Sequence, residues 1–175
     1  MKIIIKFGIF VAIMVSSYLG MGQSPSNKVY DTFSGKEGVV TLSFSKSALK
    51  PFEVLIDDET KKVVYRMEKV SFLFYNEQKG KLSALNVYNR IKSGLNDIDY
   101  FEINPDEINC NDCDIDEYDN VSLIGRGSRY SMNEFHLLVV EDDFCMLLSF
   151  YGDITVDDLK EFGKFSRSTQ TFITQ

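Results

Sequence analysis

The stretch FHLLVVEDDFCMLLSFY, residues 135–151, decides the fold class. Two apolar runs of strand length, Phe135 to Val140 and Phe144 to Tyr151, stand on either side of the acidic residues Glu141 to Asp143. A charged segment between two apolar arms is typical of the tip of a β-hairpin. Because a hairpin pairs its arms in opposite directions, we predict an antiparallel sheet built around these two strands.

Four further strands are predicted on the N-terminal side of the hairpin. Val40, Leu42 and Phe44 alternate with polar residues, which predicts a strand with one buried face and one polar face. The run VSFLFY, residues 70–75, is too short and too apolar for a surface helix and predicts a buried, central strand. Residues 98–103 and 121–126 have the composition of two more strands.

Helices are predicted between the strands and after the hairpin. The main helix shows apolar residues at three- and four-residue spacing, and it ends near Gly94: Leu82, Leu85, Tyr88, Ile91 and Leu95. Shorter helical pieces are expected after Ser47 and over residues 63–67. A last helix begins with a capping pair, Thr155 and Asp158, and buries Leu159, Phe162 and Phe165. We therefore expect an α+β fold, a single domain whose mainly antiparallel sheet is covered by two to four helices.

The first twenty-two residues have the layout of a secretory signal. Lys2 and Lys6 precede an apolar run from Phe7 to Leu19, and small residues follow before Gln23. A run of thirteen residues is shorter than the roughly 20 that a spanning helix needs. We expect cleavage near Gly22, a periplasmic or secreted protein, and no transmembrane span in the mature chain. Residues 23–30 are then a flexible lead-in, 31–168 the domain and 169–175 a tail.

The charge of the chain argues against a nucleic-acid partner. The formal net charge is −7, with 19 basic and 26 acidic residues, and removal of residues 1–22 takes away two lysines and makes it −9. Residues 96–125 hold ten acids and no Lys or Arg. Binding to a phosphate backbone draws its energy from clustered basic side chains. The partner is therefore expected to be a protein or a small ligand.

Three segments of the chain resemble one exported bacterial family. They are FSGKEGVVTLSFSKS (residues 33–47), LLVVEDDFCMLLSFYGDI (137–154) and VDDLKEF (156–162). In their order and spacing they look like domain-of-unknown-function family 4252, over about Val29 to Arg167. The resemblance is firmest at the glycines of residues 35–38 and at residues 151–154. It implies an envelope or secreted location and one α+β domain, and it brings no catalytic residue because the family has no assigned activity.

The stretch INCNDCDIDEYDN, residues 108–120, is the densest group of reactive and charged side chains. Cys110 and Cys113 have the spacing of a zinc knuckle, but zinc needs four ligands and no second pair exists. A redox role is disfavoured because Asp112 lies between the cysteines and raises their pKa by like charge. In an oxidising compartment the two cysteines can close a disulfide that pins the loop, which is the interpretation we favour.

A weak calcium site in the same acidic loop, residues 106–120, is the alternative. Its carboxylates recur at nearly alternate positions like the start of a calcium-binding loop: Asp112, Asp114, Asp116 and Asp119. The sixth position is Glu117 where glycine is needed, and the twelfth is Leu123 where glutamate is needed. A simple solvated loop also fits, and no other cofactor is expected.

No catalytic constellation is recognisable elsewhere. His136 is the single histidine, predicted to be packed or at a strand edge, and Cys145 is predicted to be a core thiol. Arg126 and Arg129 are expected to pair with the acidic loop. We therefore expect a noncatalytic binding module of the cell envelope, which predicts an exposed apolar patch or an unpaired edge strand. The alternative, an enzyme with an unrecognised site, predicts a cleft that gathers titratable groups.

Overall fold

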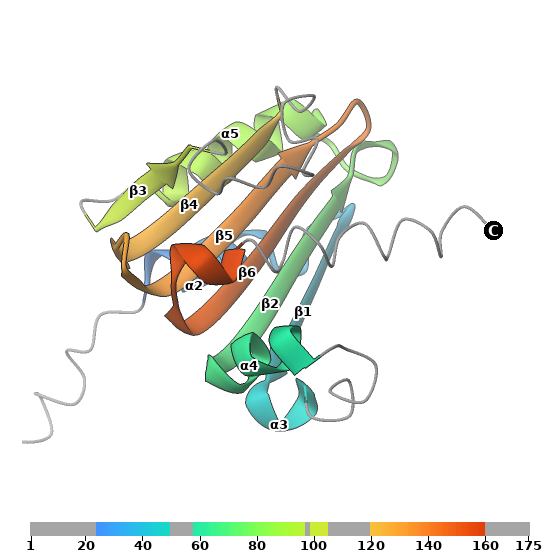
Figure 1. Cartoon of the computed structure of the whole chain (residues 1–175). Coiled ribbons are helices and arrows are strands. Elements are labelled where there is room, and N and C mark those ends of the chain that lie inside the picture. Colours follow the sequence, from blue (N-terminus) through green and yellow to red (C-terminus); the bar gives the residue numbers. More distant parts are fainter. Residues whose placement is uncertain (1–23, 50–57, 97–98, 105–119, 160–175) are drawn as a thin grey trace, which may run out of the picture.

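The computed structural model describes residues 24–49, 58–96, 99–104 and 120–159. Six strands form one sheet in the order β1-β2-β6-β5-β4-β3, and every neighbouring pair is antiparallel (Figure 1). The strands are β1 (Val39–Ser45), β2 (Met67–Asn76), β3 (Tyr100–Ile103), β4 (Val121–Ser128), β5 (Ser131–Val140) and β6 (Phe144–Ile154). The predicted α+β class and antiparallel sheet are confirmed.

The β5–β6 hairpin lies in the middle of this sheet. Val140 is opposite Cys145, and the predicted acidic tip joins the two strands, with the Glu141 amide donating to the Phe144 carbonyl at 2.9 Å. Both arms are longer than the apolar runs, because Ser131–Glu134 and residues 152–154 continue the pairing. The hairpin prediction is therefore confirmed.

The helices differ in where they contact the sheet. They are α2 (Pro25–Phe33), α3 (Lys46–Leu49), α4 (Asp58–Arg66) and α5 (Ala84–Gly94), with a short 3-10 turn, η2 (Glu77–Lys79), after β2. Figure 1 shows α2 and α5 behind the sheet, and α3 and α4 beyond one end of β1 and β2. Among the described residues no helix is long and apolar enough to cross a membrane.

Each face of the sheet has its own apolar core. The face that carries α2 and α5 buries Val29, Phe33, Leu73, Tyr75, Ala84, Val87, Ile91, Leu95, Ile124, Leu138, Val140, Cys145 and Leu147. The opposite face buries Ile103, Leu123, Met132, Phe135, Ile154 and Leu159. Successive side chains of a strand point to opposite faces of the sheet, so neighbouring residues in the sequence pack in different cores.

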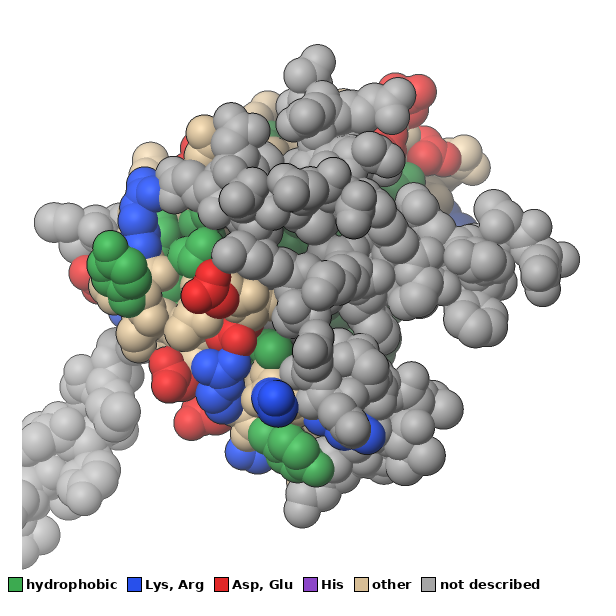
Figure 2. Space-filling view, in the orientation of Figure 1, with side chains coloured by type: hydrophobic (Ala, Val, Ile, Leu, Met, Phe, Trp, Pro, Cys, Tyr) green, Lys and Arg blue, Asp and Glu red, His purple; other side chains and the backbone are tan. Residues whose placement is uncertain are grey.

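Charge is mixed on the surface opposite the helices α2 and α5. Figure 2 shows basic, acidic and hydrophobic side chains interspersed over the described residues of this side. Interspersed charges keep local fields small. Charge alone therefore does not single out a binding surface there.

The N-terminal prediction is wrong for residues 24–30. They were expected to be a flexible lead-in, but Pro25–Phe33 forms α2, and Val29 and Phe33 are buried against the sheet. Pro25 stands in the first turn, where its missing N–H costs little. The polar residues of this segment were taken as a sign of disorder. In the structure, serine and tyrosine hydroxyls on α2 form hydrogen bonds to the sheet.

Two other predicted faces need correction. In α5 the buried residues are Ala84, Val87 and Ile91, whereas Leu85 is 57% exposed. In β1 the apolar residues were expected to be buried, but Val40, Leu42 and Phe44 are exposed. The reason is that β1 is the edge strand of the sheet and, among the described strands, has β2 as its one neighbour.

The last helix starts as predicted. The Thr155 amide donates to Asp158 Oδ2 at 2.7 Å, and the Asp158 amide donates to Thr155 Oγ1 at 3.3 Å. Leu159 is buried beside Ile154. The predicted signal (1–22), the residues expected to line a helix after Ser47 (50–57), the extension to Phe162 and Phe165, and the tail (169–175) lie outside the described residues.

Candidate functional site

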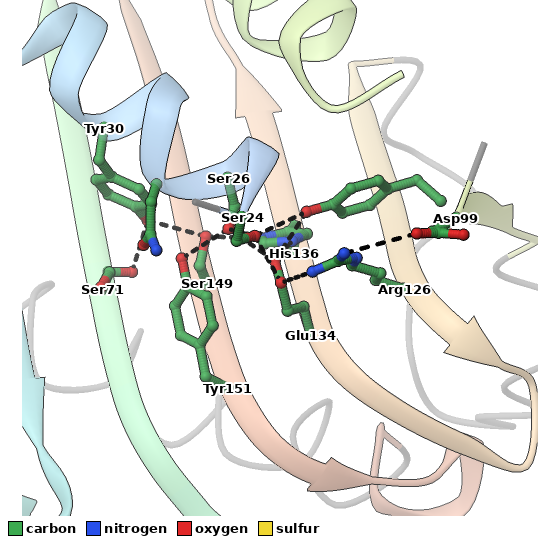
Figure 3. Close-up of polar contacts among 12 residues, drawn as sticks. Ser24, Ser26, Tyr30, Ser71, Asp99, Arg126, Glu134, His136, Ser149 and Tyr151 are labelled. Atoms are coloured by element: carbon green, nitrogen blue, oxygen red, sulfur yellow. Dashed lines mark hydrogen bonds and ion pairs between the residues drawn. The ribbon is translucent and has the colours of Figure 1, made fainter. Parts of the chain in front are cut away.

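A buried polar cluster lies between α2 and the middle of the sheet. We define the polar cluster as nine residues joined by hydrogen bonds, of which Figure 3 labels all but Tyr100: Ser24, Ser26, Tyr30, Tyr100, Arg126, Glu134, His136, Ser149 and Tyr151. Its members come from α2 and its N-cap and from strands β3 to β6. Period-two alternation brings Glu134 and His136 of β5, and Ser149 and Tyr151 of β6, to the same face of the sheet.

The Glu134 carboxylate is the centre of the cluster. Oε1 accepts hydrogen bonds from Ser24 Oγ at 2.6 Å and from Arg126 Nη1 at 2.7 Å. Oε2 accepts from Ser26 Oγ at 2.6 Å and from Tyr100 Oη at 2.8 Å. Ser24 is the N-cap residue of α2, so the carboxylate also lies at the positive end of that helix. These contacts fix the start of α2 to β5.

Burial alone raises the pKa of Glu134, but the contacts outweigh it. Contacts from His136, Ser24, Ser26 and Arg126 together hold the pKa of this carboxyl well below its usual range. Arg126 lies 3.6 Å from Asp99 on its other side, which adds a second carboxylate to the pair. Glu134 is therefore a buried anion, and it is compensated by named donors.

His136 and Ser149 extend the cluster toward Tyr30. His136 Nδ1 lies 2.7 Å from Ser149 Oγ, and the Tyr30 hydroxyl lies 2.9 Å from the same oxygen. His136 Nε2 lies 3.3 Å from Glu134 Oε2, without the alignment of a hydrogen bond. Burial lowers the pKa of His136 more than Glu134 raises it, so the neutral ring is favoured. The single Tyr30 hydroxyl proton lies between two acceptors at 2.9 Å, the Ser71 carbonyl and Ser149 Oγ, and when Ser149 donates to Nδ1 the ring proton is on Nε2, beside the carboxylate.

A serine, a histidine and a carboxylate in contact are the groups that nucleophilic hydrolases use. Here the side chains of His136 and Ser149 have 0% exposure, and Tyr30 of α2 occupies the open side of Ser149. A substrate carbonyl has no route to the hydroxyl in this arrangement. What the cluster does in this structure is hold α2 on the sheet.

The sequence contained a weak signal for this cluster. Glu134 and His136 are polar at alternate positions within one apolar strand, and Ser149 and Tyr151 repeat that pattern in the next. The prediction that His136 is packed is confirmed. Glu134 was missed because the predicted strand began one residue later.

The second candidate is the free edge of the sheet. We define the β1 edge as the side of Val39–Ser45 that pairs with no other described strand, together with the side chains of Val40, Leu42 and Phe44. These three are 52%, 48% and 37% exposed and lie on the face opposite α2. Large apolar side chains are usually buried, and three of them exposed in one row form a contiguous apolar patch, which is a feature of interaction sites.

The register shows which main-chain groups of β1 are free. The Asn76 amide donates to the Gly38 carbonyl at 2.9 Å, and these residues are directly opposite in the β1–β2 register. Hydrogen-bonded and non-bonded pairs alternate along an antiparallel ladder. Even-numbered residues of β1 therefore bond to β2, and odd-numbered residues, Thr41 and Ser43 among them, direct their N–H and C=O groups outward.

The β1 edge lacks the features that protect sheet edges. Natural edge strands are blunted by charged side chains, proline, bulges or short length. The seven residues VVTLSFS contain no charge and no proline, and their pairing with β2 has no bulge. At the other edge β3 has four residues, including Glu102. The β1 edge is therefore a ready template for another strand.

Two grooves flank α2. One, of about 560 Å³, lies between α2 and α5 and is lined by Lys28, Phe33, Lys36 and Arg90 among others. The other, of about 300 Å³, lies between α2 and β1 and is lined by polar groups such as Thr41, Ser43 and Lys69. Burial lowers the pKa of Lys69, whose Nζ lies 3.8 Å from the centre of the Tyr151 ring. Neither lining includes Glu134, His136 or Ser149.

The acidic loop that the sequence singled out lies outside the described residues up to Asp119. Cys110, Cys113, Asp112, Asp114, Asp116 and Asp119 lie outside the described residues. Cys145 is a buried free thiol, as predicted, and burial raises its pKa to about 12. Arg126 was expected to pair with the acidic loop, but it pairs with Glu134 and Asp99. In the part of the chain that the structure describes, no group of three or more His, Cys, Asp or Glu is arranged to hold a metal ion.

Comparison with known proteins gives no relative. No family model, no curated protein and no solved structure matches the chain.

Proposed function

We propose that the protein is a noncatalytic interaction module of the cell envelope that binds an extended segment of a partner protein along the β1 edge. The observation that carries this proposal is the exposure of Val40, Leu42 and Phe44 beside outward-facing main-chain groups. An added strand gains main-chain hydrogen bonds, while alternate side chains give selectivity.

The chemistry of the β1 edge fits an apolar, extended partner segment. Side chains of such a segment would cover the apolar row on one face and meet Thr41 and Ser43 on the other. Phe72 and Phe74 of β2, stacked with ring centroids 6.4 Å apart, continue the apolar row inward. The location in the envelope rests on the signal-like residues 1–22 and on the family resemblance, which stay predictions.

Site-specific photocrosslinking in the producing cells tests the proposal. A photoreactive phenylalanine analogue replaces Phe44, and a matched control places it at Leu85, a more exposed apolar residue on α5. We expect adducts from position 44 and none from position 85. A Thr41→Pro substitution in the same chain removes an outward N–H, so the added strand loses a main-chain hydrogen bond and the adducts should disappear. The β1–β2 hydrogen bonds stay intact, because the Thr41 N–H does not take part in them. Adducts at position 44 that are insensitive to this substitution would contradict strand addition.

A further inference from the structure

We infer that the strand received by the β1 edge is β1 of a second copy of this chain, paired antiparallel about a two-fold axis through Leu42. This inference rests on the proposed function and names its partner. Two seven-residue edges would then join two six-stranded sheets into one continuous sheet.

The hydrogen-bond pattern restricts the register to two-fold axes that pass through a residue, and the side chains then choose among these axes. Only odd-numbered residues face outward, so a two-fold pairing must place odd opposite odd. Centring the axis on Leu42 puts Thr41 opposite Ser43 of the second copy, and Val39 opposite Ser45. The Val39 amide already donates to the Lys36 carbonyl at 3.1 Å, so the pairing forms about six main-chain hydrogen bonds rather than eight.

The same register matches the side chains. Leu42 falls opposite Leu42 of the second copy, and Val40 falls opposite Phe44. These are the non-hydrogen-bonded positions, where Cα atoms are only about 4.5 Å apart and side chains pack most closely. The exposed row of each copy thus covers the row of the other. On the opposite face, hydroxyls of Thr41 and Ser43 meet.

The charges at the ends of β1 disfavour a parallel pairing. Lys36 and Glu37 precede the strand, with Glu37 paired to Lys81 at 3.0 Å, and Lys46 follows it, so a two-fold pairing brings Lys46 of one copy to an end of the other that carries both charges. Parallel pairing would bring like charges together. No charged residue lies within β1, so the pairing places no like charges directly opposite one another, although the net charge is −7 for the full chain and −9 without residues 1–22.

The size of the contact sets the expected strength. An interface made by two short strands belongs to the small class, below about 1,200 Å² of buried surface, which is typical of transient association. We therefore expect a reversible dimer with a dissociation constant on the order of micromolar.

Sedimentation velocity of the purified, processed chain tests the inference over a concentration series from about 1 to 300 micromolar, which brackets that constant. Leu42→Lys places two lysines opposite each other on the axis and should weaken the dimer at least about tenfold. Thr41→Pro removes an outward donor and should do the same. Leu85→Lys is the matched control, since it makes the same substitution at an exposed apolar site on α5. Circular dichroism checks that each variant is folded.

A dimer in the wild type and in Leu85→Lys, with monomers in the two β1 variants, supports the inference. A wild-type chain that stays monomeric at the highest concentration overturns it. A dimer that survives both β1 substitutions, or that Leu85→Lys also disperses, overturns it as well, because another surface is then responsible. If the chain is monomeric and position 44 still gives adducts sensitive to Thr41→Pro with a different protein, strand addition stands and only the identity of the partner falls. If neither is seen, both fall.

Discussion

Replacing Glu134 with glutamine tests whether the polar cluster holds α2 on the sheet. The carboxylate accepts four hydrogen bonds of 2.6 to 2.8 Å, two of them from Ser24 and Ser26 at the start of α2. Glutamine keeps the shape but removes the charge opposite Arg126, and its NH2 group faces donors. Breaking a buried pair by removing one partner costs about 3 to 5 kcal/mol. We expect the free energy of unfolding to fall by that amount.

Glu102→Gln is the matched control. Glu102 stands on the neighbouring part of the same face and forms an ion pair with Lys92 at 3.0 Å, but the two side chains are 59% and 40% exposed. Exposed pairs contribute only about 0 to 1 kcal/mol. Urea unfolding of both variants, followed by circular dichroism, should therefore separate them by more than about 2 kcal/mol. Equal losses would refute the reasoning, because charge removal alone would then explain the effect.

The pH dependence of stability gives the same test a second readout. The folded pKa of Glu134 is depressed, so its contribution is present above the unfolded value, near 4.5, and is lost as pH falls toward the folded value. The pKa of His136 is also lowered, so its neutral form stabilises the fold above about pH 6.5, and that contribution is lost as pH falls. Wild-type stability should thus decline as pH drops from about 6.5, with a further decline below about 4.5. Glu134→Gln should lose the lower part of this decline.

Three further predictions concern single positions. Ser149→Ala leaves His136 Nδ1 without a hydrogen-bond partner and should lower the free energy of unfolding by about 1 to 3 kcal/mol. Ser93→Ala, on the exposed side of α5, should change it by less than about 0.5 kcal/mol. Chemical denaturation of both variants measures the difference. At Gly152 φ is +143°, and the Cβ of Gly152→Ala would overlap the main-chain oxygen of Arg66, so this change should cost more than about 3 kcal/mol. Gly35→Ala also has a positive φ but meets open space, and it should cost about 1 kcal/mol. Similar melting temperatures for the two variants would contradict this. Cys145 should resist alkylation until the protein unfolds, because it is buried and its pKa is raised to about 12. Intact mass after alkylation in denaturant then shows one modified thiol if the predicted disulfide of the acidic loop exists, and three if it does not.

The strands and the hairpin could be predicted from the sequence because their signals are local. Alternation in residues 40–45, the apolar run at 70–75 and the acidic tip at 141–143 depend only on neighbours in the chain. The cap formed by Thr155 and Asp158 is local too, and the structure has both of its bonds to the main chain. Local patterns fix which residues form an element.

The polar cluster could not be predicted for the opposite reason. Ser24 and Glu134 are 110 residues apart, and nothing in either neighbourhood indicates the other. The apolar stripe of α2 is short, Val29 and Phe33, and follows serines, proline and asparagine, so the segment up to Tyr30 was taken for a lead-in. Its attachment depends on hydroxyls that meet a carboxylate only after the sheet has formed.

By itself the sequence determined the fold class, the central hairpin and the two-faced pattern of the strands, since each follows from the spacing of side chains along the backbone. Only the tertiary structure decided which of those faces are covered. Val40, Leu42 and Phe44 have the same alternation as a buried strand, but strand order leaves β1 at the edge and their side chains exposed. Periodicity specifies the direction of a side chain, whereas burial depends on what the rest of the chain places against it.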